Sequence, residues 1–160
     1  MKIEYDLPEF AAFDLLKNND GLTRAAESAG TPVVISFTVE TNGKLPSGQT
    51  LKEAIEKVDK ATNNTPVYCM VNCAHPTHFE GALASDESWV QRISGIRANA
   101  SSKSHAELDE AEELDDGNPV GLGRQYKALT DRLHHINVLG GCCGTDQRHI
   151  QEICKAWIGV

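Results

Sequence analysis

The sequence alternates strand-like and helix-like segments, and this alternation limits the folds open to the chain. Strand-like apolar runs occupy residues 33–39, 67–71, 95–99 and 136–139. Each run is followed by a helix start signal or by apolar residues at helical spacing. Strands that alternate with helices in this way form a parallel sheet covered by helices. The sequence therefore predicts an α/β fold that contains four βα units.

The predicted helices are recognised by their first residues. The expected N-terminal residues are Thr50, Pro76, Ser104, Pro119 and either Thr145 or Asp146. Thr50 and Ser104 each have a glutamate three residues later, which completes a capping box. Proline suits the first turn of a helix because its missing N–H is not needed there. After Thr50, the apolar residues at positions 51, 54, 55 and 58 share one helical face.

The first 30 residues are less regular. Residues 22–29 have helical character and stop at Gly30, a residue type that favours a helix C-terminus. Residues 1–20 show no strong period, and no element is assigned to them. The expected organisation is an unassigned segment, 1–20, followed by a domain at 21–160.

Composition argues against several kinds of partner. The 160-residue chain has a net charge of -8 and no run of Lys or Arg, which argues against a nucleic-acid or anionic-membrane partner. No apolar stretch approaches the roughly 20 residues that span a bilayer, and acidic residues stand where a signal peptide needs an apolar run. We therefore expect a cytoplasmic protein. Its five cysteines, an odd number, fit free or metal-bound thiols better than disulfides.

Two cysteine motifs follow two of the predicted strands. Cys142 and Cys143 lie among glycines directly after the run 136–139, and Cys73 follows the run 67–71. Adjacent cysteines pair with each other only under strain. The carboxyl ends of parallel strands share one rim, so the three thiols should meet there. Three thiolates with an open fourth position are typical of a catalytic zinc site.

Other polar residues are candidates for the same rim. Glu40 and Asn99 stand at the ends of the first and third predicted strands, and Asn72 precedes Cys73. His75 and His78 are alternative metal ligands, although capping of the next helix or hydrogen bonding at the rim explains them better. The acidic segment 107–116 is expected to be a solvated face or a cover for the site. Two further cysteines, Cys69 in a strand and Cys154 on a helix, are expected in the core.

The cysteine motifs resemble those of the homocysteine S-methyltransferase family. The resemblance is carried by residues 71–76 and 140–145, and extends to residues 36–40, 45–48, 97–101 and 104–116. It covers residues 21–157. The resemblance implies a (β/α)8 barrel of the TIM type, of which this chain corresponds to the second half. It also implies that Cys73, Cys142 and Cys143 are zinc ligands and that Glu40, Asn72 and Asn99 contact substrate.

The implied activity is zinc-dependent methyl transfer from a methyl donor to the thiol of homocysteine, which forms methionine. Four βα units do not close a barrel of eight. We therefore expect a fragment or a split-gene half, which requires a second polypeptide or self-association to complete the barrel. Two alternatives stay open: a non-enzymatic zinc-binding or assembly module whose fourth ligand is His75 or His78, and a redox thiol protein.

Overall fold

The computed structural model describes residues 11–14 and 19–159. The strands are β1 (Ala11–Asp14), β2 (Val33–Phe37), β3 (Tyr68–Asn72), β4 (Ile93–Ala98) and β5 (Val138–Gly141). The helices are α1 (Asn19–Ser28), α2 (Leu51–Thr62), α3 (Pro76–Phe79), α4 (His105–Asp109), α5 (Pro119–Arg132) and α6 (Gln147–Ile158). Two 3-10 turns, η1 (Ala82–Ala84) and η2 (Ser88–Arg92), lie between α3 and β4.

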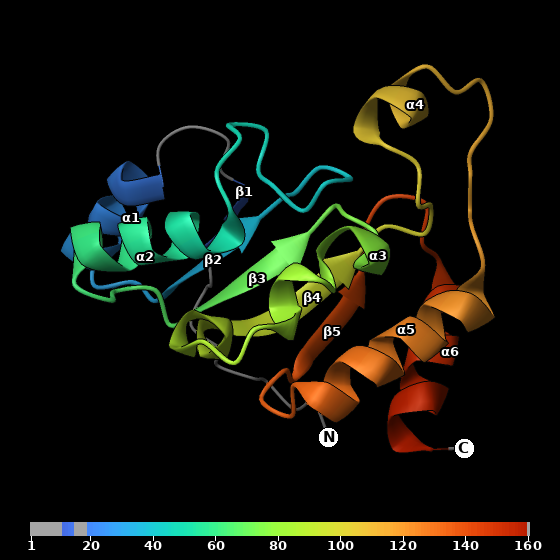
Figure 1. Ribbon diagram of the computed structural model, residues 1–160. Helices are drawn as coiled ribbons and strands as arrows, with labels where there is room; N and C mark the ends of the chain where they lie inside the picture. Colours follow the sequence, from blue (N-terminus) through green and yellow to red (C-terminus); the bar gives the residue numbers. More distant parts are fainter. Residues whose placement is uncertain (1–10, 15–18, 160) are drawn as a thin grey trace, which may run out of the picture.

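The strands form one parallel sheet in the order β1-β2-β3-β4-β5. This confirms the α/β class and the parallel sheet. The described sheet has β1 and β5 at its two edges, so it is an open sheet. Its strands point their carboxyl ends toward the side of the molecule that carries α4 (Figure 1).

The structure adds one strand that the sequence analysis did not assign. β1 lies within the segment 1–20 and pairs with β2, with Ala11 opposite Val33 and Asp14 opposite Ser36. The count of four βα units is therefore corrected to five strands in the described part of the chain. The four residues of β1 carry no β-branched side chain, so the local pattern is weak and pairing with β2 defines the strand. The rest of residues 1–18 lies outside the described residues.

The helix signals are confirmed. Complete capping boxes begin α2 at Thr50 and α4 at Ser104, and Pro76 and Pro119 occupy the first turns of α3 and α5. Asp146, and not Thr145, is the N-cap of α6. No helix in the described part of the chain is long and apolar enough to cross a membrane.

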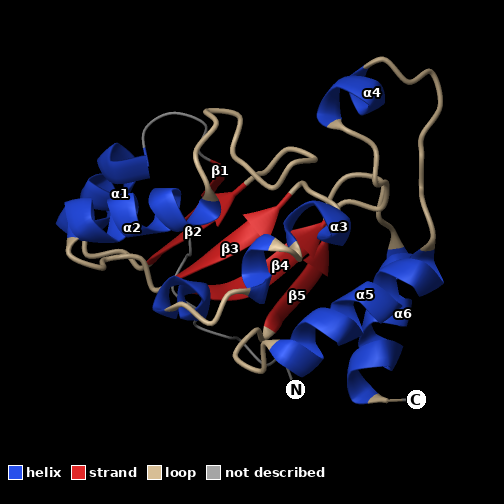
Figure 2. Ribbon diagram, viewed as in Figure 1, coloured by secondary structure: helices blue, strands red, loops and turns tan. Residues whose placement is uncertain are grey.

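The core lies between the sheet and the helices on one of its faces (Figure 2). β2 contributes Val33, Ile35 and Phe37 to this layer, because alternate residues of a strand face the same side. Helix α5 buries Tyr126 and Leu129 in it. Sheet and helices therefore share one core, and the cysteine loops lie at the rim of the sheet.

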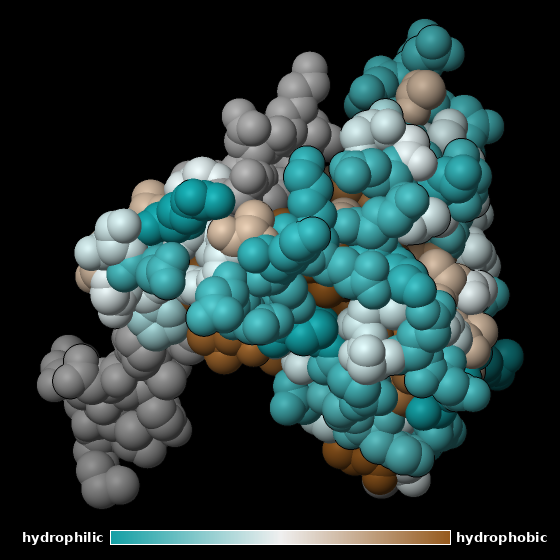
Figure 3. All heavy atoms as spheres, turned by 60° about the vertical axis from the view of Figure 1, so that its left-hand side comes forward, coloured by the Kyte–Doolittle hydropathy of each residue, from teal (hydrophilic) through white to brown (hydrophobic). Residues whose placement is uncertain are grey.

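The apolar residues of α6 are only partly buried. Ile153 is buried, whereas Ile150 and Trp157 are 40% and 49% exposed. Cys154 is exposed, so its expected place in the core was wrong. Helix α6 packs against α5 and β5, and β5 is an edge strand, so one face of α6 has no packing partner among the described residues. Figure 3 shows a mainly hydrophilic surface on one side of the molecule, with small hydrophobic areas between the hydrophilic side chains.

Candidate metal centre

Cys73 is placed by an unusual backbone conformation directly after β3. Its φ angle is 50°, in the left-handed region that residues other than glycine seldom adopt, at a typical cost of about 1–3 kcal/mol. Its amide donates to the carbonyl of Arg97 at 3.1 Å, and its own carbonyl lies 2.7 Å from Nε2 of His105. The strained turn is thus held by hydrogen bonds to β4 and to α4.

The second pair of thiols is held against the end of β4. The Cys142 amide donates to the carbonyl of Ala98 at 2.8 Å, and the Ala100 amide donates to the carbonyl of Cys143 at 3.0 Å. The Cys143 amide donates to Oδ1 of Asn99 at 3.1 Å. These bonds extend the strand pairing past the formal ends of β4 and β5. They give the turn a defined position relative to β4.

Two glycines allow this turn to pack tightly. Gly144 has a φ of 75°, and a Cβ atom there would lie 2.9 Å from the carbonyl oxygen of Asp115. A Cβ atom on Gly141 would overlap the side chain of Thr145, whose hydroxyl donates to the carbonyl of Cys142 at 2.7 Å. Gly141 and Gly144 are therefore required for a steric reason: a side chain at either position would clash with a neighbouring group.

The three thiols converge, as expected for residues that follow the carboxyl ends of parallel strands. The Sγ atoms of Cys73, Cys142 and Cys143 all lie within 4.8 Å of one another, and those of Cys73 and Cys142 are 2.7 Å apart. Cys73 and Cys142 are half-buried and Cys143 is exposed. Among the residues that the structure describes, no other group of three or more His, Cys, Asp or Glu side chains is arranged to hold a metal ion.

The thiols differ in acidity because they interact. The hydrogen bond from the Cys73 thiol lowers the pKa of Cys142 to about 5, against the opposing effect of burial. Burial and the neighbouring charge of Cys142 raise the pKa of Cys143. The Cys142 side chain is therefore mainly a thiolate at neutral pH, stabilised by the neighbouring Cys73 thiol. Such a cluster is a soft, anionic donor set.

Comparison with known families gives a match over nearly the whole chain. The sequence model for homocysteine S-methyltransferase matches residues 5–157 of the 160. The chain belongs to the homocysteine S-methyltransferase family. No solved structure matches it. The family match begins within the segment 1–20 and so includes β1.

The thiol cluster suits the metal associated with the homocysteine S-methyltransferase family. Tetrahedral zinc with Zn–S bonds of about 2.3 Å places its sulfur ligands about 3.8 Å apart. The sulfurs lie within 4.8 Å of one another, so the cluster has the required scale, although Cys73 and Cys142 must separate by about 1 Å. Thiolates are preferred zinc ligands. The donor set therefore fits zinc, and its spacing fits once the sulfurs of Cys73 and Cys142 have moved apart.

The candidate substrate residues of this family member lie around the cluster. Asn72 Nδ2 is 3.6 Å from Sγ of Cys73, and Asn72 Oδ1 accepts a hydrogen bond from Thr38 at 3.0 Å. Asn99 is buried and holds the amide of Cys143. Oε2 of Glu40 lies 3.2 Å from Nδ1 of His105. All three side chains stand at the same rim as the thiols.

The two histidines considered as alternative ligands make other contacts. Nδ1 of His75 caps α3 by accepting from the Thr77 amide, and lies 2.8 Å from the Thr77 hydroxyl. Nε2 of His78 lies 2.9 Å from the carbonyl oxygen of Ser102. Neither belongs to the thiol group. The capping interpretation therefore holds for His75.

His105 is a site residue that the sequence analysis missed. It appeared only as the first helical residue after the cap Ser104, yet its ring joins the carbonyl of Cys73 to Glu40. Burial opposes its positive charge, but the bonds to Cys73 and Glu40 raise the pKa of His105 above its ordinary value. The only signal in the sequence was its position at the start of a segment that follows a strand end.

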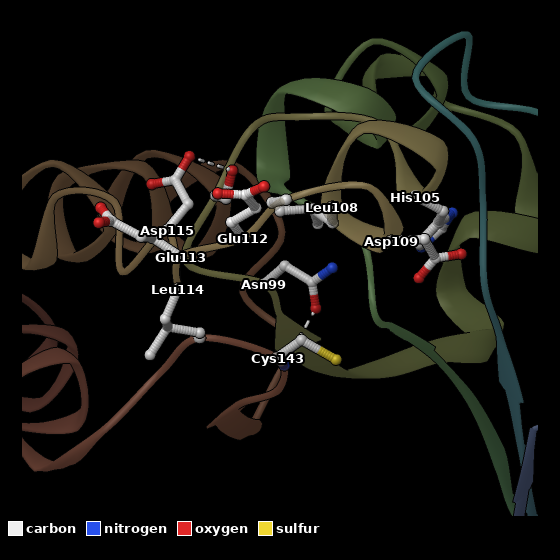
Figure 4. Close-up of a pocket in the computed structure, with 12 residues that line it drawn as sticks. Asn99, His105, Leu108, Asp109, Glu112, Glu113, Leu114, Asp115 and Cys143 are labelled. Carbon is white, nitrogen blue, oxygen red and sulfur yellow. Dashed lines mark hydrogen bonds between the residues drawn. The ribbon is translucent and has the colours of Figure 1, made fainter.

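A cavity of about 400 Å³ opens beside Cys143. In Figure 4, Asn99 and Cys143 lie on one side of it, and side chains from α4 and the following loop lie on the other. The second group includes Leu108, Asp109 and Glu112. The acidic segment thus borders a cavity next to a thiol, as a cover for the site would.

Proposed function

We propose that this chain transfers a methyl group to the thiol of homocysteine, forming methionine, with a zinc ion held by Cys73, Cys142 and Cys143. The observation that carries the proposal is the convergence of three thiols from two strand ends within 4.8 Å. Membership of the homocysteine S-methyltransferase family supports both the substrate and the reaction. The cavity beside Cys143 is large enough for a small amino acid.

The chemistry is a displacement at carbon. The homocysteine thiol gives its proton to water, its sulfur forms a bond to the methyl carbon, and the bond from that carbon to the donor atom breaks, with its electron pair left on the donor atom. When bound, zinc would stabilise the homocysteine sulfur as a thiolate at neutral pH. The chain's own residues orient the site: Asn99 holds the amide of Cys143, and His105 holds the carbonyl of Cys73.

The proposal also assigns substrate contacts to the polar side chains at the rim. Glu40, Asn72 and Asn99 would contact the amino and carboxylate groups of homocysteine, since they stand near the thiols and offer both acceptors and donors. The free state of all five cysteines suits a reducing compartment, which supports a cytoplasmic location.

The same proposal includes a second polypeptide chain that completes the site. In the described sheet, β1 pairs only with β2, and β5 pairs only with β4. A closed parallel barrel leaves no such edges. We propose that another polypeptide or a second copy of this chain pairs with them. Mass measurement in solution at several concentrations tests the second copy: a dimer supports it, and a monomer that forms methionine alone contradicts any need for a partner.

Zinc content tests the metal centre. The purified, reduced chain should retain about one zinc per molecule, and Cys142→Ser should lose most of it, because one of three thiolates is removed. Cys154→Ser is the matched control, since this exposed thiol is absent from the cluster. A wild-type chain without zinc, or a Cys142→Ser variant with full zinc, contradicts the proposal.

Activity is a separate test. The zinc-loaded chain is mixed with homocysteine and with S-methylmethionine, S-adenosylmethionine or betaine in turn, and methionine is measured by mass spectrometry. Formation of methionine from one donor supports the proposal. Zinc binding without methionine from any donor, alone or with a completing half barrel, supports the non-enzymatic zinc module instead. That alternative also requires a closed fourth site, so His75→Ala or His78→Ala would sharply lower zinc affinity.

One observation favours a second function, reversible thiol oxidation. The Sγ atoms of Cys73 and Cys142 are 2.7 Å apart, and the low pKa of Cys142 provides a thiolate at neutral pH. A redox protein would form a Cys73–Cys142 disulfide quickly when the metal-free chain is treated with oxidised glutathione. Slow or mixed disulfide formation under those conditions contradicts this reading.

A further inference from the structure

Tyr126 reaches from the middle of α5 to the sheet directly below the thiol turn. The sequence pattern places it on the apolar stripe of α5, and its side chain is buried to 1% exposure. A buried tyrosine hydroxyl normally needs a hydrogen-bond partner. The partners of this hydroxyl are backbone groups of two different strands.

The hydroxyl joins the last residues of β4 to those of β5. It accepts a hydrogen bond from the amide of Ala98 at 2.8 Å and donates to the carbonyl of Gly140 at 2.5 Å. The carbonyl of Ile96 lies 3.4 Å away. Burial raises the pKa of this hydroxyl, so it stays protonated and can act as donor and acceptor together.

The bridged groups lie next to the candidate ligands. The carbonyl of Ala98 accepts the amide of Cys142, and the side chain of the following residue, Asn99, accepts the amide of Cys143. Gly140 precedes Cys142 by two residues. Within the described sheet β4 is the only strand beside β5, so contacts to β4 decide where the end of β5 lies.

We propose that Tyr126 is a positioning residue for the metal centre. By joining the Ala98 amide to the Gly140 carbonyl, its hydroxyl sets the separation between the ends of β4 and β5. This separation determines where Cys142 and Cys143 stand relative to Cys73, which follows β3 and whose amide is bonded to Arg97 of β4. The inference rests on the proposed function, because it takes these three thiols to hold zinc.

Tyr126→Phe removes the hydroxyl and keeps the ring that fills the core. Zinc affinity of the full chain, measured by competition with a chromogenic chelator, should fall about tenfold, the lower end of the effect of groups that orient metal ligands. Cobalt substitution reports the geometry directly. The thiolate-to-cobalt charge-transfer and ligand-field bands of Tyr126→Phe should shift or weaken relative to the wild type.

Two controls separate positioning from general stability. Thr62→Val removes another buried hydroxyl, which donates to the carbonyl of Val58 within α2. Leu129→Val disturbs packing on the same face of α5 and leaves the bridge intact. Both should keep wild-type zinc affinity and wild-type cobalt bands, even where their melting temperatures fall as far as that of Tyr126→Phe.

The outcomes distinguish this inference from the proposed function. Unchanged affinity and cobalt bands in Tyr126→Phe overturn the positioning role and leave the zinc site standing. The positioning role is also overturned if zinc affinity falls in all three variants in proportion to their loss of stability. A wild-type chain that binds neither zinc nor cobalt overturns the proposed function, and the positioning role with it.

Discussion

The backbone amide of Cys143 donates to the side-chain oxygen of Asn99 at 3.1 Å. A residue at the end of β4 therefore holds the turn that ends β5. The Asn99 side chain is buried, whereas Cys143 is exposed, so this amide–amide bond lies at the boundary between the core and the cavity. The backbone amide of Asn99 donates to the carbonyl of Ala74 at 3.1 Å, and Ala74 lies in the loop after Cys73. Asn99 thus connects the loops that carry the two cysteine motifs.

Asn99→Ala should weaken metal binding more than folding. The change leaves the Cys143 amide without its acceptor, and loss of such an orienting group lowers metal affinity by about 10–100-fold. Zinc affinity by chelator competition is the measurement, with circular dichroism to check the fold. The exposed Asn137 offers a control, and equal zinc affinity in Asn99→Ala and Asn137→Ala would contradict the role of Asn99.

Gly144→Ala should destabilise the chain by about 2–4 kcal/mol, because a left-handed alanine costs about 1–2 kcal/mol and overpacking adds a similar amount. The new Cβ would meet the carbonyl of Asp115 at 2.9 Å. Gly48 has a similar φ, 83°, with nothing within 4 Å of a Cβ. Gly48→Ala should therefore cost only about 1–2 kcal/mol. Urea denaturation measures both, and equal losses would mean that the close packing at Gly144 has no energetic weight.

The cysteines should differ in their reaction with iodoacetamide in metal-free, reduced protein. Within the cluster Cys142 should react first at pH 6, since its pKa of about 5 leaves it largely as thiolate, and its rate should fall as the pH drops below 5. Cys69 should stay unmodified, because burial raises its pKa to about 12. Peptide mass spectrometry identifies the labelled residue.

The same labelling experiment distinguishes the thiols of the cluster from the exposed thiol at the surface. Added zinc should protect Cys142, whereas the exposed Cys154 should react at the same rate with or without zinc. Labelling of Cys69 before Cys142, or zinc protection of Cys154, would be inconsistent with the burial and grouping described above.

Acid should destabilise the fold in part through His75. Burial, with a smaller effect of His78, lowers the pKa of His75 to about 4 from 6.5. The unfolded chain therefore takes up this proton first, and stability falls as the pH drops from about 6.5 to 4. The loss is about 1–3 kcal/mol at pH 4 by the free energy of such a shift.

His75→Asn isolates this effect. Asparagine does not titrate and keeps an acceptor for the Thr77 amide at the start of α3. Urea denaturation at pH 7 and pH 4.5 should show a smaller loss of stability for the variant than for the wild type. An identical pH dependence in the two proteins would remove His75 from the explanation.

Much of the fold follows from local sequence. The capping boxes at Thr50 and Ser104 appear in the structure, because a cap depends on residues three positions apart. The strands 33–39 and 67–71 were recognised for a similar reason, although β2 ends at Phe37, where its pairing with β3 ends. Convergence of the thiols was also foreseeable, since parallel strands deliver their carboxyl ends to one rim.

The features that were missed depend on contacts between distant residues. β1 is defined by pairing with β2, and Cys154 is exposed because α6 packs on one side only. His105 reaches Cys73 across 32 residues, and Tyr126 reaches Ala98 across 28. No local period signals such contacts.

The sequence by itself determined the α/β class, the helix starts and the identity of three thiols, because these depend on residue type and short-range spacing. Only the tertiary structure decided how the thiols are held. The strained turn at Cys73, the support from Asn99 and His105, and the Tyr126 bridge arise when separate βα units pack together. Each of these contacts joins groups that only the assembled sheet brings within hydrogen-bonding distance.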